Sequence, residues 1–155
     1  MVHVAIIGTG DMAYGLSHLF TINNSSSSGN KLEVTKPNLS VEKSAFHETK
    51  VPVTDFDDAL VRADVLILAI PGSAILSFVA THLPKLKGKI LVDVTNDASV
   101  DVHLGKEELE YSEIEWVKAF NDIGAVDILL SKVGKMLYSL LHSFKYSYSH
   151  KICVR

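Results

Sequence analysis

The feature that most constrains this chain is its opening stretch, VHVAIIGTGDMAYGLSHLF, in which an apolar run is followed at once by two glycines. Residues 4–7 are Val, Ala, Ile and Ile, and a short run of this kind predicts a strand that is buried on both faces of a sheet. After the turn Gly8-Thr9-Gly10, apolar residues recur at the spacing of a helix that begins at Asp11. The sequence therefore predicts a strand, a glycine turn and a helix in direct succession.

The two glycines and a later alanine match a fingerprint of dinucleotide binding, G-x-G-x-x-G/A. Gly8 permits a tight turn out of the strand, Gly10 leaves the backbone open to a pyrophosphate, and Ala13 is the small residue where helix meets strand. The first turn of the helix offers N–H groups and the positive end of its dipole to phosphates. An ordinary turn with incidental glycines is the alternative, and the flanking strand and helix favour dinucleotide binding over it.

The rest of the chain alternates between predicted strands and helices. We expect strands at residues 31–35, 65–70, 89–95 and 115–120, and a short edge strand at 50–53. Helices are expected over residues 59–62, capped by Asp55 or Asp57, and over residues 74–83, ending near Pro84. This alternation predicts the α/β class, with a doubly wound, mainly parallel Rossmann sheet.

We expect one Rossmann domain over residues 1–125, followed by a C-terminal helix and tail at 126–155 that form no separate domain. The predicted C-terminal helix is amphipathic, and its apolar stripe consists of Leu129, Leu130, Val133, Met136, Leu137, Leu140, Leu141 and Phe144. This stripe could cover the sheet or pair with a second copy of the chain, because so long an apolar face rarely stays in water.

Composition excludes several classes of partner. The net charge of −3 provides no basic field for a nucleic acid, and no apolar run has the length of a membrane span. The single cysteine cannot form an internal disulfide, and none of the seven histidines has the spacing of a metal site. The first residues lack the pattern of a signal peptide, so we expect a cytoplasmic protein without a bound metal.

The end of the second predicted strand bears on the choice of cofactor. An NAD site places Asp or Glu there, whereas this chain has Thr35 and Lys36, a hydroxyl and a cation that suit a 2′-phosphate. Glu33 is acidic but lies within the strand and is expected to point elsewhere. The sequence thus favours NADP over NAD, the alternative being a solvated lysine on a loop.

Two later segments, GKILVDVTN at residues 88–96 and WVKAFNDIGA at 116–125, carry a family resemblance. Together with the GTGD turn, they resemble the deazaflavin-dependent NADP reductases and the related cytoplasmic reductase domain of the STEAP metalloreductases. Those families end the second strand with a Ser-Arg pair, to which Thr35-Lys36 is similar. The resemblance covers residues 2–125 and does not extend to the last thirty residues or so.

The resemblance implies roles for particular residues at the ends of the strands. It implies that the pyrophosphate is wrapped by Gly8, Thr9, Gly10, Asp11 and Met12. It implies that Ile70 and Pro71 lie against the cofactor and that the nicotinamide is bordered by Asn96, Ala119, Phe120 and Asn121. For Asn96 a helix cap or turn residue is an equal alternative, and for Lys118 a peripheral position is favoured over a catalytic amine.

The predicted function is NADP(H)-dependent hydride transfer to a flavin or deazaflavin-type acceptor, for which no catalytic side chain is identified. Such a reaction needs positioning and exclusion of water more than acid–base groups. Two alternatives stay open: a non-catalytic NADP(H)-binding sensor or truncated variant, and an imine reductase resembling pyrroline-carboxylate reductase. The first is motivated by the region after residue 125, where an acceptor-binding half is not recognisable.

Overall fold

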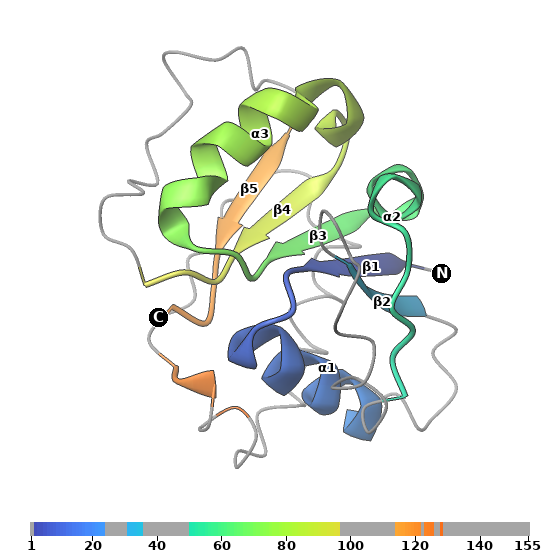
Figure 1. Ribbon diagram of the computed structural model, residues 1–155, viewed down its shortest axis with the longest axis vertical. Coiled ribbons are helices and arrows are strands. Elements are labelled where there is room, and N and C mark those ends of the chain that lie inside the picture. The colour runs from blue at the N-terminus through green and yellow to red at the C-terminus, as the bar shows by residue number, and fades with distance from the viewer. Residues whose placement is uncertain are drawn as a thin grey trace.

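A computed structural model describes residues 2–23, 31–35, 50–96, 114–121, 123–125 and 128. Its centre is a five-stranded sheet in the order β2-β1-β3-β4-β5, and every pair of neighbouring strands is parallel (Figure 1). The strands are β1 (His3–Ile7), β2 (Lys31–Thr35), β3 (Val65–Leu68), β4 (Ile90–Asp93) and β5 (Glu115–Lys118). The predicted α/β class with a parallel Rossmann-like sheet is confirmed.

Helices cover both faces of the sheet, as predicted (Figure 1). One face packs against α1 (Asp11–Asn23), and the other packs against α2 (Phe56–Arg62) and α3 (Gly72–Leu86). Because side chains alternate along a strand, each strand contributes to both cores. In β1, for example, Val4 and Ile6 belong to the α1 core, whereas Ala5 and Ile7 belong to the α2–α3 core.

Three strands end earlier than the sequence predicts. β3 ends at Leu68 rather than at residue 70, β4 at Asp93 rather than at 95, and β5 at Lys118 rather than at 120. At β4 the cause is local, because the N–H of Thr95 is bonded to the Asp93 side chain at 2.8 Å. At β5 the backbone turns at Phe120, whose φ is 62°. Apolar composition continues past these points, but the strand geometry does not.

The helix expected to end near Pro84 continues to Leu86. Pro84 cannot donate to the carbonyl of Ala80, four residues earlier. Both residues are exposed, so water can satisfy that carbonyl, and the helix tolerates the proline in its last turn. The expected cap of the preceding helix is confirmed at Asp55, whose side chain accepts from the N–H groups of Asp57 and Asp58.

The edge strand predicted at residues 50–53 is reduced to a single parallel bridge between Val53 and Val34 of β2. Pro52 has no N–H to donate, but its carbonyl accepts from Val34 at 2.9 Å. The segment thus runs along the outer side of β2, where a sixth strand would lie. The predicted C-terminal helix lies outside the described residues, except that Ile128 is buried in the α1 core.

Candidate functional site

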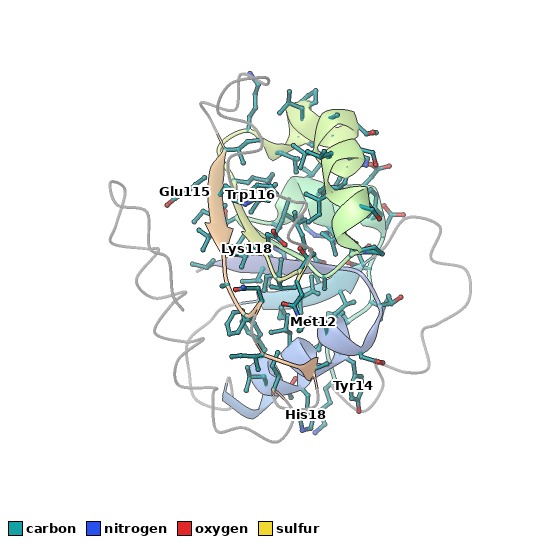
Figure 2. All side chains as sticks on the ribbon, turned by 90° about the vertical axis from the view of Figure 1, so that its left-hand side faces the viewer. Met12, Tyr14, His18, Glu115, Trp116 and Lys118 are labelled. Carbon is teal, nitrogen blue, oxygen red and sulfur yellow. The ribbon has the colours of Figure 1, made fainter. Side chains whose placement is uncertain are left out.

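The strands bring the predicted site residues to one edge of the sheet. Because all strands are parallel, a single row of paired residues crosses the sheet near its carboxyl edge: Thr35, Ile7, Leu68, Asp93 and Lys118. Figure 2 shows Lys118 at the end of β5 and Met12 near the start of α1. Ligands of open α/β sheets bind beyond this edge, at the point where the strand order reverses. That point lies between β1 and β3, because β2 flanks β1 on one side and β3 on the other.

Gly8 lies at this reversal and is required there by its surroundings. Its φ is +129°, and a Cβ built on it would lie 2.2 Å from the backbone oxygen of Ala69, just after β3. Its N–H donates to the carbonyl of Thr35 at 2.8 Å. Gly8 thus allows the ends of β1, β2 and β3 to meet, which no residue with a side chain could do.

Gly10 is different, because a Cβ on it would meet nothing within 4 Å. Its carbonyl accepts from the N–H of Tyr14 at 3.0 Å, which is the first hydrogen bond of the helix. The N–H groups that come before Tyr14 in the chain therefore have no carbonyl partner within the helix. Asp11 is exposed, Thr9 and Met12 are half-buried, and Ala13 is fully buried against the sheet. An exposed glycine at a helix N-terminus suits a diphosphate, so these residues fit the predicted dinucleotide.

The end of β2 corrects one expectation. Thr35 is fully buried, and its hydroxyl donates to the carbonyl of Thr54 at 2.8 Å. Its proton is therefore used within the protein and is not presented to a 2′-phosphate, contrary to the prediction. The reason is the segment beside β2, which places a backbone acceptor next to this side chain. Lys36, the other residue predicted here, lies outside the described residues.

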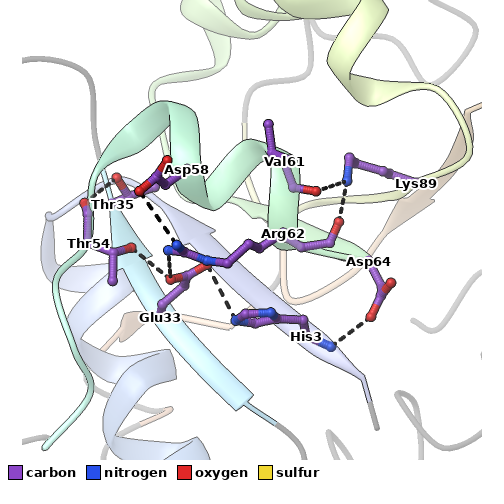
Figure 3. A network of polar contacts seen from close by, with 10 residues as sticks. His3, Glu33, Thr35, Thr54, Asp58, Val61, Arg62, Asp64 and Lys89 are labelled. Carbon is purple, nitrogen blue, oxygen red and sulfur yellow. Dashed lines mark hydrogen bonds and ion pairs between the residues drawn. The ribbon is translucent and has the colours of Figure 1, made fainter.

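Glu33 lies within β2, as predicted, and is 3% exposed. Figure 3 shows its carboxylate held by Arg62 and Thr54, each at 2.8 Å. His3 Nε2 lies 3.5 Å from its other oxygen. Both hydrogen bonds are to one oxygen, Oε2, and the carboxylate is buried within β2, so Glu33 is not placed to serve as the acidic ribose ligand that an NAD site requires.

The remaining predicted residues follow β3, β4 and β5. Ile70 is half-buried and packs on the α2–α3 core, whereas Pro71 is exposed and precedes the first turn of α3. Asn96 is exposed, two residues beyond the last core residue of that segment, Val94. Ala119 is buried, and its N–H donates to the carbonyl of Asp93 at 3.0 Å.

Phe120 occupies an unusual backbone conformation for a large side chain. Its φ of 62° is left-handed, and the residue is 7% exposed within the α1 core. Such a conformation is disfavoured for residues with a side chain and is maintained by surrounding packing. Asn121 follows, half-buried, in the turn that Phe120 begins.

Sequence reasoning missed a buried ion pair at this edge. Lys118 Nζ lies 2.9 Å from Asp93 Oδ2, and the two side chains are 16% and 1% exposed. Lys118 lies on the edge strand β5, in keeping with the peripheral position that was expected, but its ammonium group is buried against Asp93 rather than solvated. A signal was present in the sequence: Asp93 and Lys118 each stand at the end of their strand, and parallel pairing of those strands makes them neighbours.

Family comparison agrees with this geometry. Residues 3–97 match the family model described as NADP oxidoreductase, coenzyme F420-dependent. The matched range contains the glycine turn, β1 to β4 and Asn96. A curated relative, glycerol-3-phosphate dehydrogenase [NAD(P)+] of Pseudomonas fluorescens, is 40% identical over 50 residues, which are 32% of this chain and 15% of that enzyme.

Solved structures share the fold at low sequence identity. A hypothetical protein of Sinorhizobium meliloti has a TM-score of 0.61 at 22% identity, covering 92% of this chain and 80% of that one. A candidate F420-dependent NADP reductase of an Arthrobacter species has a TM-score of 0.60 at 20% identity, covering 95% and 82%.

A third neighbour, 3-hydroxyisobutyrate dehydrogenase of Mycobacterium tuberculosis, has a TM-score of 0.60 at 19% identity. The match covers 77% of this chain but only 40% of the dehydrogenase. The chain thus spans less than half the length of this neighbour. No helix among the described residues is long and apolar enough to cross a membrane.

Proposed function

The chain belongs to the family of coenzyme F420-dependent NADP oxidoreductases, and from this premise we propose that it is an NADPH-dependent oxidoreductase. The proposed reaction is hydride transfer between the nicotinamide of NADP(H), bound at the carboxyl edge, and a flavin or deazaflavin acceptor. The observation that carries the proposal is the turn from Gly8 to Gly10. Gly8 packs tightly against Ala69, whereas Gly10 has no neighbour within 4 Å of the position of a Cβ. This turn lies where the strand order reverses.

The pyrophosphate of the cofactor would lie over the start of α1. Backbone N–H groups of Thr9, Gly10, Asp11 and Met12 are the proposed donors, and the helix dipole adds a favourable field. Ala13 would act indirectly, because its small side chain lets α1 approach the sheet.

A preference for NADP over NAD would come from Lys36. A cation after β2 favours the 2′-phosphate of NADP, and Glu33 is already bound to Arg62 and Thr54. The buried Thr35 hydroxyl has no part in this proposal, and the backbone of Thr35 instead holds Gly8 in place.

The nicotinamide would lie toward β3, β4 and β5, beside Ile70 and Pro71 and near Asn96 and the turn at 119–121. The cofactor supplies the hydride chemistry, and the protein supplies orientation and exclusion of water. Ile70 offers an apolar surface, and the turn at Phe120 is held firmly by its buried ring. We propose no general acid or base.

Finer assignments follow the sequence-based expectations. The electron acceptor is proposed to be a small molecule. Within the family, a relation to the cytoplasmic domain of the metalloreductases is also proposed. We further propose a cytoplasmic location and a pairing of two copies through residues 129–144.

Fluorescence titration tests the cofactor assignment directly. We expect NADPH to bind more tightly than NADH, and Lys36→Glu to weaken NADPH far more than NADH. Lys31→Glu is the matched control, because it makes the same charge change at the opposite end of β2. If the unaltered protein binds neither cofactor at micromolar concentration, the proposed function is wrong. Equal losses for both cofactors in Lys36→Glu would refute the 2′-phosphate role alone.

An acceptor screen tests the reaction. Oxidation of NADPH by a flavin or deazaflavin, followed by the loss of the absorbance of the reduced nicotinamide, would support the proposed transfer. Binding of NADPH without transfer to any flavin would instead identify a non-catalytic module. Turnover of a cyclic imine would identify an imine reductase.

A further inference from the structure

One side-chain atom at the carboxyl edge is left without a partner. Among the described residues, two buried side-chain polar atoms make no hydrogen bond, Glu33 Oε1 and Thr95 Oγ1. Glu33 Oε1 lies 3.5 Å from His3 Nε2, in the network already described. Thr95 Oγ1 lies directly after β4, next to Asn96. The large majority of buried polar groups in proteins are hydrogen-bonded, so an unpaired hydroxyl at a candidate site calls for a partner.

The backbone of Thr95 is held in place by its neighbours. Its N–H donates to Asp93 Oδ1 at 2.8 Å, and the other carboxylate oxygen of Asp93 accepts from Lys118 at 2.9 Å. Both oxygens of the buried carboxylate are therefore used, one on the loop after β4 and one on β5. A hydroxyl mounted on such a fixed backbone is preorganised to bind a ligand.

We propose that the Thr95 hydroxyl hydrogen-bonds the carboxamide of the nicotinamide. This inference rests on the proposed function and adds a specific contact to it. A carboxamide offers both a donor and an acceptor, and a hydroxyl can answer either. The position also fits, because β4 lies on the opposite side of the β1–β3 reversal from β2, beside which the adenosine end is proposed.

Thr95→Val is the decisive substitution, because it replaces the hydroxyl by a methyl group of similar size. Calorimetric titrations with NADPH and with 2′,5′-ADP, which lacks the nicotinamide, separate the two ends of the site. We expect NADPH affinity to fall about three- to tenfold, the typical value of one hydrogen bond, and 2′,5′-ADP affinity to stay unchanged. Without ligand, the variant should melt at the same or a higher temperature, since an unpaired buried hydroxyl has been removed.

Two further variants serve as controls. Thr95→Ser retains the hydroxyl and should retain most of the NADPH affinity. Thr81→Val removes a hydroxyl that donates to Ser77 on the exposed side of α3, and should change neither affinity.

The outcomes separate this inference from the proposed function. Unchanged NADPH affinity in Thr95→Val overturns the inference, and so does an equal loss for NADPH and 2′,5′-ADP, which indicates a structural role. If the unaltered protein binds 2′,5′-ADP and NADPH, the proposed cofactor stands whatever the variant does. If it binds neither, the inference falls together with the proposed function.

Discussion

The buried pair between Lys118 and Asp93 permits a quantitative test of what holds the carboxyl edge together. Lys118→Met keeps the apolar stem of the lysine and removes its ammonium group. Among the described residues, the Asp93 side chain, which is 1% exposed, then keeps only the N–H of Thr95 as a partner. Removing one member of a buried ion pair leaves an uncompensated charge and costs about 3–5 kcal/mol. Because a domain is stable by only about 5–15 kcal/mol, we expect a large part of the stability to be lost.

Equilibrium unfolding in urea, followed by circular dichroism, measures this loss. The double variant Asp93→Asn/Lys118→Met removes both charges together and should be clearly more stable than Lys118→Met alone, so the two effects are not additive. Lys85→Met is the matched control, because Lys85 pairs with Asp57 between α2 and α3, where both side chains are largely exposed. That control should lose far less. A loss in Lys118→Met no larger than in Lys85→Met would refute the reasoning.

Three other predictions follow from the described geometry. Gly8→Ala should lower the melting temperature severely, because its Cβ would lie 2.2 Å from a backbone oxygen, whereas Gly10→Ala should leave the melting temperature unchanged and weaken NADPH binding. Titration calorimetry and thermal melts on both variants check this pair, and equal melting temperatures would contradict it. Asp55→Ala should cost about 1 kcal/mol in urea unfolding, because the start of α2 loses the side chain that accepts from two of its N–H groups. Burial lowers the pKa of His82, and Lys85 acts in the same direction. The unfolded chain therefore binds a proton there more readily than the folded protein, so stability should fall as pH drops below about 6.5. In His82→Gln the stability should depend less steeply on pH over that range, and an unchanged slope would contradict the assignment.

β1, β3 and β4 were predictable because each is mainly a short apolar run, and the parallel order of the strands follows from their alternation with helices. The glycine turn was equally readable, because Gly8 and Gly10 stand between a clear strand and a clear helix. The ends of the strands were not readable, since they depend on single contacts. The bond from Thr95 N to the Asp93 side chain is one, and the left-handed backbone of Phe120 is another.

The site was predictable in its location and less so in its chemistry. The topology alone brings the ends of all five strands to one edge, whatever their side chains do. The direction of a side chain depends on its neighbours in space: the Thr35 hydroxyl turns to Thr54, 19 positions away, and Lys118 turns to Asp93, 25 positions away. No local pattern carries that information, although strand pairing once known would have suggested the second contact.

Gly15, in α1, lies against the chain that follows the turn at Phe120, and its small size allows this contact. A Cβ on Gly15 would lie 3.1 Å from the carbonyl oxygen of Ala125, so the chain that leaves the Phe120 turn comes back to rest against the middle of α1. α1, which faces the proposed phosphates, thus packs against the chain beyond the turn that borders the proposed nicotinamide. This contact exists without a bound cofactor. A larger residue at position 15 should therefore displace both the start of α1 and the turn at Phe120.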